Sequence, residues 1–282
     1  MDPLAAAVRR LAALALALVA TGALGACGGD DPREQVERYI LDANAVQKRA
    51  EPAFKRANEA YVAFSQRGAK DAVAQPEGAA TGEPEEIAAA EQAIRRTRAQ
   101  IARLRPPADA VALHRMLVRV FDVNADMAHE TTLLARYLPA AEAAVAPLDA
   151  ISARLRRRLA SAPDPGHQTR ALRAYFLSLD LLIARLGRLA VPPVLAPTHR
   201  AQTARLTSAR LLAKRLRAAI ADQDAKRVAS LLKQFRRLNA RRDRERRLTN
   251  RAIRSYLKRY RAITRVVQDA QRERLRLERK FD

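Results

Sequence analysis

The sequence predicts an all-α protein, an antiparallel bundle of six or seven helices, from its composition and its breaks. Hydrophobic residues make up 49% of the 282 residues, and most are Ala and Leu rather than the Val, Ile and aromatic residues that sheets prefer. The few prolines and glycines fall where helices would end or restart. A single Cys excludes a disulfide framework and a Cys-based zinc site.

The first 26 residues have the order of a cleaved secretory signal. Arg9 and Arg10 precede an apolar run at 11–20, and small residues follow from Thr21 to Ala26. The run is shorter than the roughly 20 apolar residues that span a membrane. An uncleaved membrane anchor is the alternative.

The signal ends in Leu24-Gly25-Ala26-Cys27, which resembles the lipobox of bacterial lipoproteins. The resemblance implies cleavage before Cys27 and a diacylglyceryl group on its sulfur. Two or more acyl chains hold a protein stably on a bilayer, so we expect a lipid anchor on the extracytoplasmic face of the cell membrane. Residues 27–32 would then be a spacer between the lipid and the fold.

We expect the mature chain to comprise a bundle at 33–238, whose helices are separated by helix breakers, and a basic C-terminal helix at 239–282 that packs on the bundle or projects from it. From Asp224 onward there is neither Pro nor Gly, so the remaining residues could form one helix about 87 Å long. The breakers predict helices at 33–67 (kinked or restarted at Pro52), 84–105, 108–138, 139–162 (restarted at Pro139), 167–190 and 195–221, with a linker at 69–83 and a turn at 163–166.

One internal similarity predicts a duplicated helical hairpin. Residues 101–114 and 186–199 both read as a helix end, a Pro-Pro step and a His early in the next helix, and the first prolines, Pro106 and Pro192, lie 86 residues apart. A Pro-Pro step makes a stiff corner between antiparallel helices. Chance reuse of the same helix breaker is the alternative.

Positive charge is concentrated at the C-terminal end. Residues 200–282 hold 27 Lys+Arg against 8 Asp+Glu, and residues 1–199 hold 26 against 22. Within 239–247 the only apolar residue is Ala240, so we expect a hinge or a projecting arm at 239–250. The overlapping window 236–247 predicts an anion-contact patch, with a merely solvated face as the alternative; the patch comprises Arg236, Arg237, Arg241, Arg242, Arg244, Arg246 and Arg247.

Export restricts the partners of such a patch. Clustered arginines on an intracellular protein would indicate nucleic acid, but an exported lipoprotein meets anionic phospholipids, acidic wall polymers or a protein partner. We therefore expect a non-enzymatic surface lipoprotein that serves as a helical scaffold or interaction module. A helical protein of the envelope that binds a ligand or a metal is the alternative.

No catalytic or cofactor-binding motif is recognisable, and we expect neither an enzyme nor a cofactor. The best metal candidate is Asp122, Asp126 and His129, which lie at i, i+4 and i+7 on one helix face. Ordinary ion pairs with Arg115 and Arg119 on the same helix are the favoured explanation of this face. Tyr256 and Tyr260 could stack on a base or a sugar, or simply continue an apolar stripe.

Overall fold

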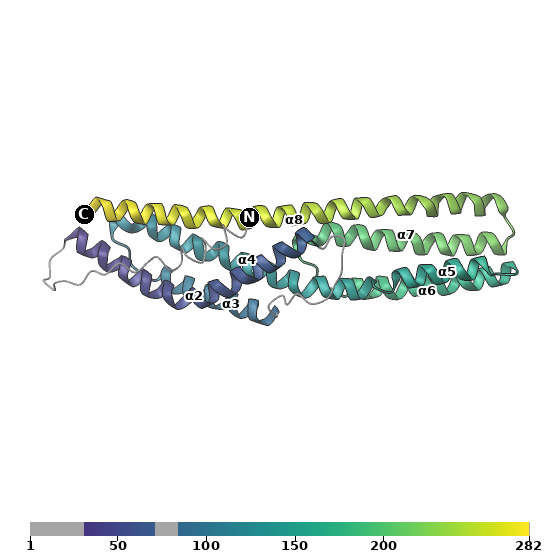
Figure 1. The fold of residues 1–282 in the computed structure, drawn as a ribbon, viewed down its shortest axis with the longest axis horizontal. Helices are drawn as coiled ribbons and strands as arrows, with labels where there is room; N and C mark the ends of the chain where they lie inside the picture. The colour runs from purple at the N-terminus through teal and green to yellow at the C-terminus, as the bar shows by residue number, and fades with distance from the viewer. Residues whose placement is uncertain (1–30, 71–83, 282) are drawn as a thin grey trace. The chain divides into compact units, whose positions relative to one another are not determined.

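The computed structural model describes residues 31–70 and 84–281 and confirms the all-α fold, with no strand in these ranges. Cys27, the signal and most of the linker at 69–83 lie outside them. The described elements, seen in Figure 1, are α2 (Pro32–Lys70), α3 (Pro84–Ala102), the 3-10 helix η1 (Ala108–Ala110), α4 (Val111–Val145), α5 (Leu148–Ala160), α6 (Pro165–Gly187), the 3-10 helix η2 (Pro193–Leu195), α7 (Ala196–Ala221) and α8 (Ala225–Phe281).

The chain forms two compact units, and two long helices contribute to both. Unit 1 comprises residues up to Thr132 and from Tyr256 onward, and unit 2 comprises residues from Leu133 to Ser255. Helix α4 therefore begins in unit 1 and ends in unit 2, and α8 begins in unit 2 and ends in unit 1. Each unit is described by itself below.

In unit 1, α8 runs antiparallel to α4 and packs its tyrosines into the core. Arg259 of α8 pairs with Glu130 of α4 at 2.6 Å, and Lys280 pairs with Asp109 at 2.7 Å, so residue numbers rise along one helix as they fall along the other. Tyr256 is 1% exposed, and its hydroxyl lies 2.7 Å from the Thr131 hydroxyl.

The second tyrosine of the pair is also a core residue. Tyr260 is 8% exposed, and its hydroxyl donates to Asn58 Oδ1 of α2 at 3.0 Å. Two rings buried in this way present no face to a base or a sugar. Tyr256 and Tyr260 therefore continue the apolar stripe of α8, and the stacking alternative is wrong.

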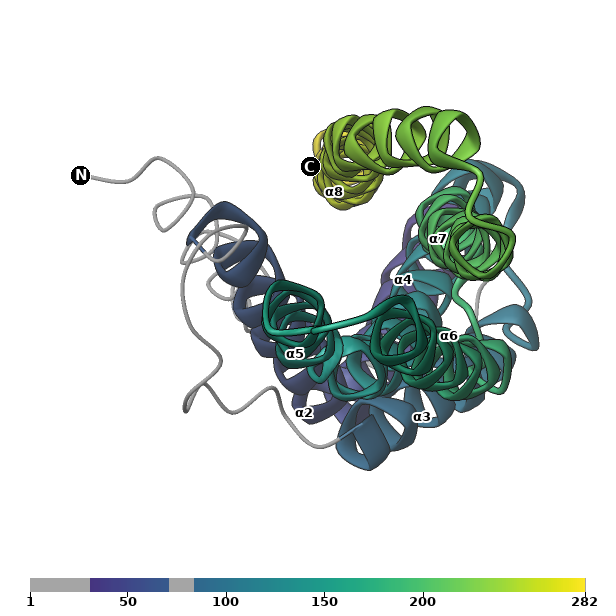
Figure 2. The ribbon, with the colours of Figure 1, turned by 90° about the vertical axis from the view of Figure 1, so that its right-hand side faces the viewer.

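In unit 2 the core lies among α6, α7 and the first part of α8, with α5 packed on α6. Figure 2 shows α5 beside α6 and α6 beside α7. Leucines spaced three and four apart supply most of the core. The buried leucines are Leu172, Leu179, Leu182 and Leu186 of α6, Leu206, Leu212 and Leu216 of α7, and Leu231 and Leu238 of α8.

The two units repeat one local architecture at an offset of 85 residues. In unit 1 the amides of Arg103, Leu104 and Ala110 donate to Gln100, Ile101 and Pro107. In unit 2 the amides of Arg188, Leu189 and Leu195 donate to Arg185, Leu186 and Pro192. Each bond has its counterpart 85 positions later. Pro107, the second proline of the first pair, therefore corresponds to Pro192, the first proline of the second pair. The offset is 85 residues rather than the 86 residues that separate the first prolines of the two pairs.

The same offset aligns the buried faces of the helices on either side of the Pro-Pro corner. Ile94 and Ile101 of α3 correspond to Leu179 and Leu186 of α6, and all four are fully buried. The equivalence continues in the next helices, where Phe121, Met127, Ala128 and Thr131 of α4 correspond to the buried Leu206, Leu212, Ala213 and Leu216 of α7. A chance Pro-Pro step would not reproduce buried positions over two helices, so the duplication holds.

Each unit also has one tyrosine hydroxyl bonded to the histidine that follows its Pro-Pro corner. Tyr39 lies 3.1 Å from Nδ1 of His114, and Tyr137 lies 3.0 Å from Nδ1 of His199. Both histidines are the fourth residue of their helix. Burial lowers the pKa of both histidines and raises the pKa of Tyr39 to about 12, because burial disfavours the charged forms.

Pro139, which predicts a restart, lies inside a helix instead. It lies within α4, which continues to Val145, whereas Pro52 lies within α2 without restarting it, as the kink alternative allows. The break comes at Pro147, which is helical at φ −71° and ψ −10° and opens α5. A proline removes one hydrogen bond of a helix, and the buried Leu134, Tyr137 and Ala144 on both sides of Pro139 hold that part of α4 in place by packing.

The predicted hinge at 239–250 is also wrong, because α8 is helical without a break from Ala225 to Phe281. Glu245 lies in the middle of that stretch and accepts a hydrogen bond from Nε of Arg205 on α7 at 2.6 Å. These side chains are only 15% and 13% exposed. A polar contact between helices thus replaces the apolar stripe that the sequence lacks here.

Candidate anion-contact surface

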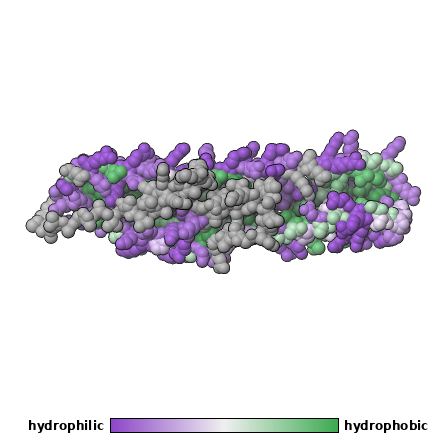
Figure 3. All heavy atoms as spheres, in the orientation of Figure 1, coloured by the Kyte–Doolittle hydropathy of each residue, from purple (hydrophilic) through white to green (hydrophobic). Residues whose placement is uncertain are grey.

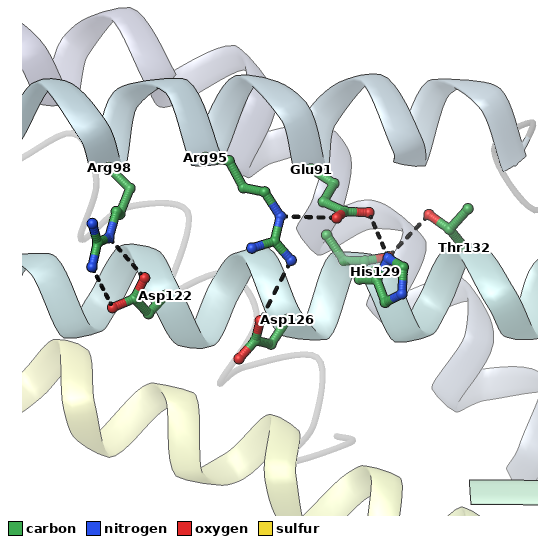
Figure 4. Close-up of polar contacts among 8 residues, drawn as sticks. Glu91, Arg95, Arg98, Asp122, Asp126, His129 and Thr132 are labelled. Atoms are coloured by element: carbon green, nitrogen blue, oxygen red, sulfur yellow. Dashed lines mark hydrogen bonds and ion pairs between the residues drawn. The ribbon is translucent and has the colours of Figure 1, made fainter. Parts of the chain in front are cut away.

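The acidic face of α4 that suggests a metal site is occupied by ion pairs from α3 (Figure 4). Arg98 donates through Nε to Asp122 Oδ1 at 2.9 Å, and Arg95 bridges Glu91 at 3.0 Å and Asp126 at 3.5 Å. Each acid therefore faces a guanidinium, as an interhelical ion pair requires.

The third member of the metal candidate, His129, faces a different carboxylate. Its Nδ1 lies 3.1 Å from Glu91 Oε2, which is on α3 rather than α4. Within 31–70 and 84–281, no group of three or more His, Cys, Asp or Glu is arranged to hold a metal ion. The ion pairs also come from Arg95 and Arg98 of α3, and not from arginines of α4 itself.

The predicted arginine patch lies on the part of α8 that belongs to unit 2. Arg236, Arg237, Arg244, Arg246 and Arg247 are all exposed, and the side chains of Arg241 and Arg242 lie outside the described set. At about 100° per residue, four of the five share one side of the helix within an arc of about 100°. Arg246 lies about 80° outside that arc.

Four more cations that the patch prediction missed extend the same side of α8. Together they form what we call the α8 cationic stripe. It spans the 29 residues from Lys226 to Arg254, about 42 Å of helix at 1.5 Å per residue, and points away from the face that carries Leu231, Leu238 and Glu245. Its members, all exposed, are Lys226, Lys233, Arg236, Arg237, Arg244, Arg247, Arg251 and Arg254.

A helical wheel of the sequence would have found these cations. A search for the densest run of Arg favours residues that are close in sequence, whereas a surface on a helix collects residues three, four and seven apart. Lys233, Arg251 and Arg254 follow that second pattern. The chemically relevant unit is one side of α8 and not the window 236–247.

No cation of the stripe is paired with an acid among the residues that the structure describes. None of its eight members takes part in an ion pair there, and the ion pairs of α8 with other helices use Glu245, Arg259 and Lys280 instead. Figure 3 shows hydrophilic side chains projecting along α8. Exposed cations that form no ion pairs attract external anions over about a Debye length, about 8 Å at physiological salt.

Comparison with known protein families, with curated proteins and with solved structures gave no match for this chain. Among its described residues, no helix has a stretch both long and apolar enough to cross a bilayer.

Proposed function

We propose that this chain is a non-enzymatic lipoprotein, anchored through Cys27 on the extracytoplasmic face of the cell membrane, whose α8 cationic stripe binds anionic phospholipid headgroups. The observation that carries the proposal is the stripe itself, eight exposed cations on one side of one helix without internal ion pairs. The helical units serve as the scaffold that holds this side of α8 straight.

The energetics of the stripe suit a flat charged surface. Each basic residue close to an anionic membrane contributes about 1 kcal/mol, so four or five simultaneous contacts give about 4 to 5 kcal/mol. That corresponds to millimolar to sub-millimolar binding on its own. Such weak contacts suffice for a protein that a lipid anchor already holds at the bilayer, because the second contact is then intramolecular.

Vesicle binding of charge-reversal variants tests the stripe. The chain from Gly28 to Asp282, which contains every described residue, is mixed with phosphatidylglycerol vesicles at fixed salt. The stripe variant carries Arg236→Glu, Arg244→Glu, Arg247→Glu and Arg251→Glu. Because about 1 kcal/mol is lost for each cation, its affinity should fall at least 100-fold.

A matched control separates the stripe from net charge. The control variant reverses four exposed cations of α2 that likewise lack ion pairs, Lys48, Arg49, Lys55 and Arg56. Both variants change the net charge equally, and the control should bind vesicles nearly as well as the unmodified chain. Equal losses in both variants would reduce the effect to overall charge and overturn the proposal. Binding to a purified wall polymer but not to vesicles would replace the phospholipid as the partner.

The anchor has its own test in the full chain. Cys27→Ala should abolish acyl labelling and leave the signal uncleaved. The more conservative Cys27→Ser should give the same result, because a thioether requires the sulfur. Labelling that survives either substitution would contradict the lipid anchor.

A further inference from the structure

A groove between α7 and α8 of unit 2 lies beside the α8 cationic stripe and shares Arg237 with it. It has a volume of about 350 Å³. The lining residues of α7 are Ser208, Leu211, Leu212 and Arg215, and those of α8 are Gln234, Arg237 and Leu238. Two arginines, a serine and a glutamine thus line the groove together with three leucines.

The internal duplication allows the groove to be compared with the corresponding helix pair of unit 1, α4 and α8, in which an acid and an arginine form an ion pair. Arg215 corresponds at the 85-residue offset to Glu130, between the aligned buried pairs Ala128/Ala213 and Thr131/Leu216. In unit 1, Glu130 accepts a 2.6 Å hydrogen bond from Arg259 of α8. The fold therefore accommodates an acid at this position, and in unit 1 that acid links α4 to α8.

Unit 2 places two cations where unit 1 has an ion pair. Arg215 and Arg237 line the same groove, both exposed, and neither has an ion pair among the described residues. Like charges across a helix interface oppose folding, and no acidic residue lines the groove. A neighbouring acid therefore does not explain Arg at position 215, whereas two guanidinium groups that line one groove suit a doubly charged anion.

The floor of the groove adds an apolar requirement to the ligand. Leu211 is 43% exposed, although Leu212 and Leu238 beneath it are buried at 7%. A hydrophilic anion such as inorganic phosphate would leave this leucine in water. An alkyl chain would cover it, at about 25 cal/mol for each Å² of apolar surface removed from water.

We propose that this groove binds a phosphorylated single-chain lipid, with the phosphate between Arg215 and Arg237 and the alkyl chain along Leu211 and Leu212. The inference rests on the proposed function and deepens it, because it names one lipid class for a defined site next to a general electrostatic surface. Gln234 also lines the groove, and its side-chain amide can donate a hydrogen bond to a remaining phosphate oxygen.

Binding of dodecyl phosphate below its micelle concentration tests the groove without a bilayer. Titration calorimetry on the chain from Gly28 to Asp282 should give saturable binding of one molecule. Arg215→Glu, which restores the residue type of unit 1, should weaken binding by about tenfold or more because it removes one charged hydrogen-bond donor and adds a repulsive charge. Arg217→Glu, an exposed α7 change outside the groove lining, is the matched control and should leave binding unchanged.

A second readout separates a ligand site from a merely structural arginine. Arg215→Glu can pair with Arg237, so without ligand it should melt at the same or a higher temperature than the unmodified chain while binding less. A lower melting temperature together with unchanged binding would overturn the proposal. So would inorganic phosphate binding as tightly as dodecyl phosphate, which would make the groove a site for free phosphate.

The groove and the stripe can fail separately. Dodecyl phosphate binding that persists in the stripe variant, with vesicle binding lost, supports both proposals. If the unmodified chain binds vesicles but not dodecyl phosphate, only the proposal for the groove is overturned. If it binds dodecyl phosphate but not vesicles, the proposal for the stripe is overturned.

Discussion

The ion pair of Arg205 and Glu245 offers a quantitative test of how the basic part of α8 is held. Arg205→Met keeps most of the apolar stem of the side chain but removes the guanidinium that faces Glu245 at 2.6 Å. It leaves a carboxylate that is only 15% exposed without a cation. If α8 projected from the unit, as the sequence suggests, this substitution would have almost no effect on stability.

The expected loss lies between two known limits. Breaking a fully buried pair costs about 3–5 kcal/mol, and breaking an exposed pair costs about 0–1 kcal/mol. Side chains that are 13% and 15% exposed lie nearer the buried limit but retain some water, so we expect about 2 kcal/mol. For a protein of this size, that is about 4–8 °C in Tm.

A double-mutant cycle measured by thermal and urea unfolding, followed by circular dichroism at 222 nm, gives the answer. Glu245→Leu and the double variant complete the cycle, and the coupling energy should be about 2 kcal/mol. Arg272→Met breaks a pair with Asp269 whose side chains are 77% and 50% exposed, and it should cost less than about 0.5 kcal/mol. A coupling energy for Arg205 and Glu245 as small as this control would refute the packing of α8 on α7.

Three further changes test the described fold. Gln223 has φ of 55° in the turn after α7, where Asp224 N donates to Ala219 O and Gln223 N to Ile220 O. Because glycine adopts positive φ without steric strain, Gln223→Gly should raise the free energy of unfolding by about 0.5–1 kcal/mol. A lower urea midpoint would contradict this. Leu182→Ala empties a site that is 1% exposed and should cost about 2–5 kcal/mol; a loss below 1 kcal/mol would place Leu182 outside the core. His114 and His199 have lowered pKa values in the folded chain, so the unfolded chain binds more protons below about pH 6.5 and stability should fall as the pH drops from 7.5 to 5.5. Replacing both histidines by Gln should make stability less dependent on pH in this range. An unchanged slope would show that these histidines do not cause the pH dependence.

The sequence predicted the fold well wherever local signals decide it. Ala- and Leu-rich segments with sparse breakers gave helices, and the Pro-Pro steps gave corners, because both depend on the backbone preferences of a few adjacent residues. Pro139 was the exception. Its missing hydrogen bond is a local cost, but the packing of Leu134 and Ala144 on either side is a property of the folded unit that no single-helix pattern reveals.

The candidate sites show the same division between local and tertiary information. The arginines of the patch were predictable from charge density, but their common side of α8 needed the helix to be continuous through 239–250. The partners of Asp122 and Asp126 are Arg98 and Arg95 of α3, and a helical wheel of α4 alone cannot identify residues of another helix. The groove was the least predictable from the sequence. Identifying it requires the antiparallel register of α7 and α8 and the comparison of Arg215 with the corresponding Glu130.

Salt dependence of vesicle binding tests the central claim most directly. The chain from Gly28 to Asp282 is titrated with phosphatidylglycerol vesicles and with neutral phosphatidylcholine vesicles from 50 to 300 mM salt. If the α8 cationic stripe binds headgroups by charge, affinity for the anionic vesicles should fall by about tenfold or more across this range, with no binding to the neutral vesicles. Affinity that stays constant with salt, or that is equal for both vesicles, would contradict the account.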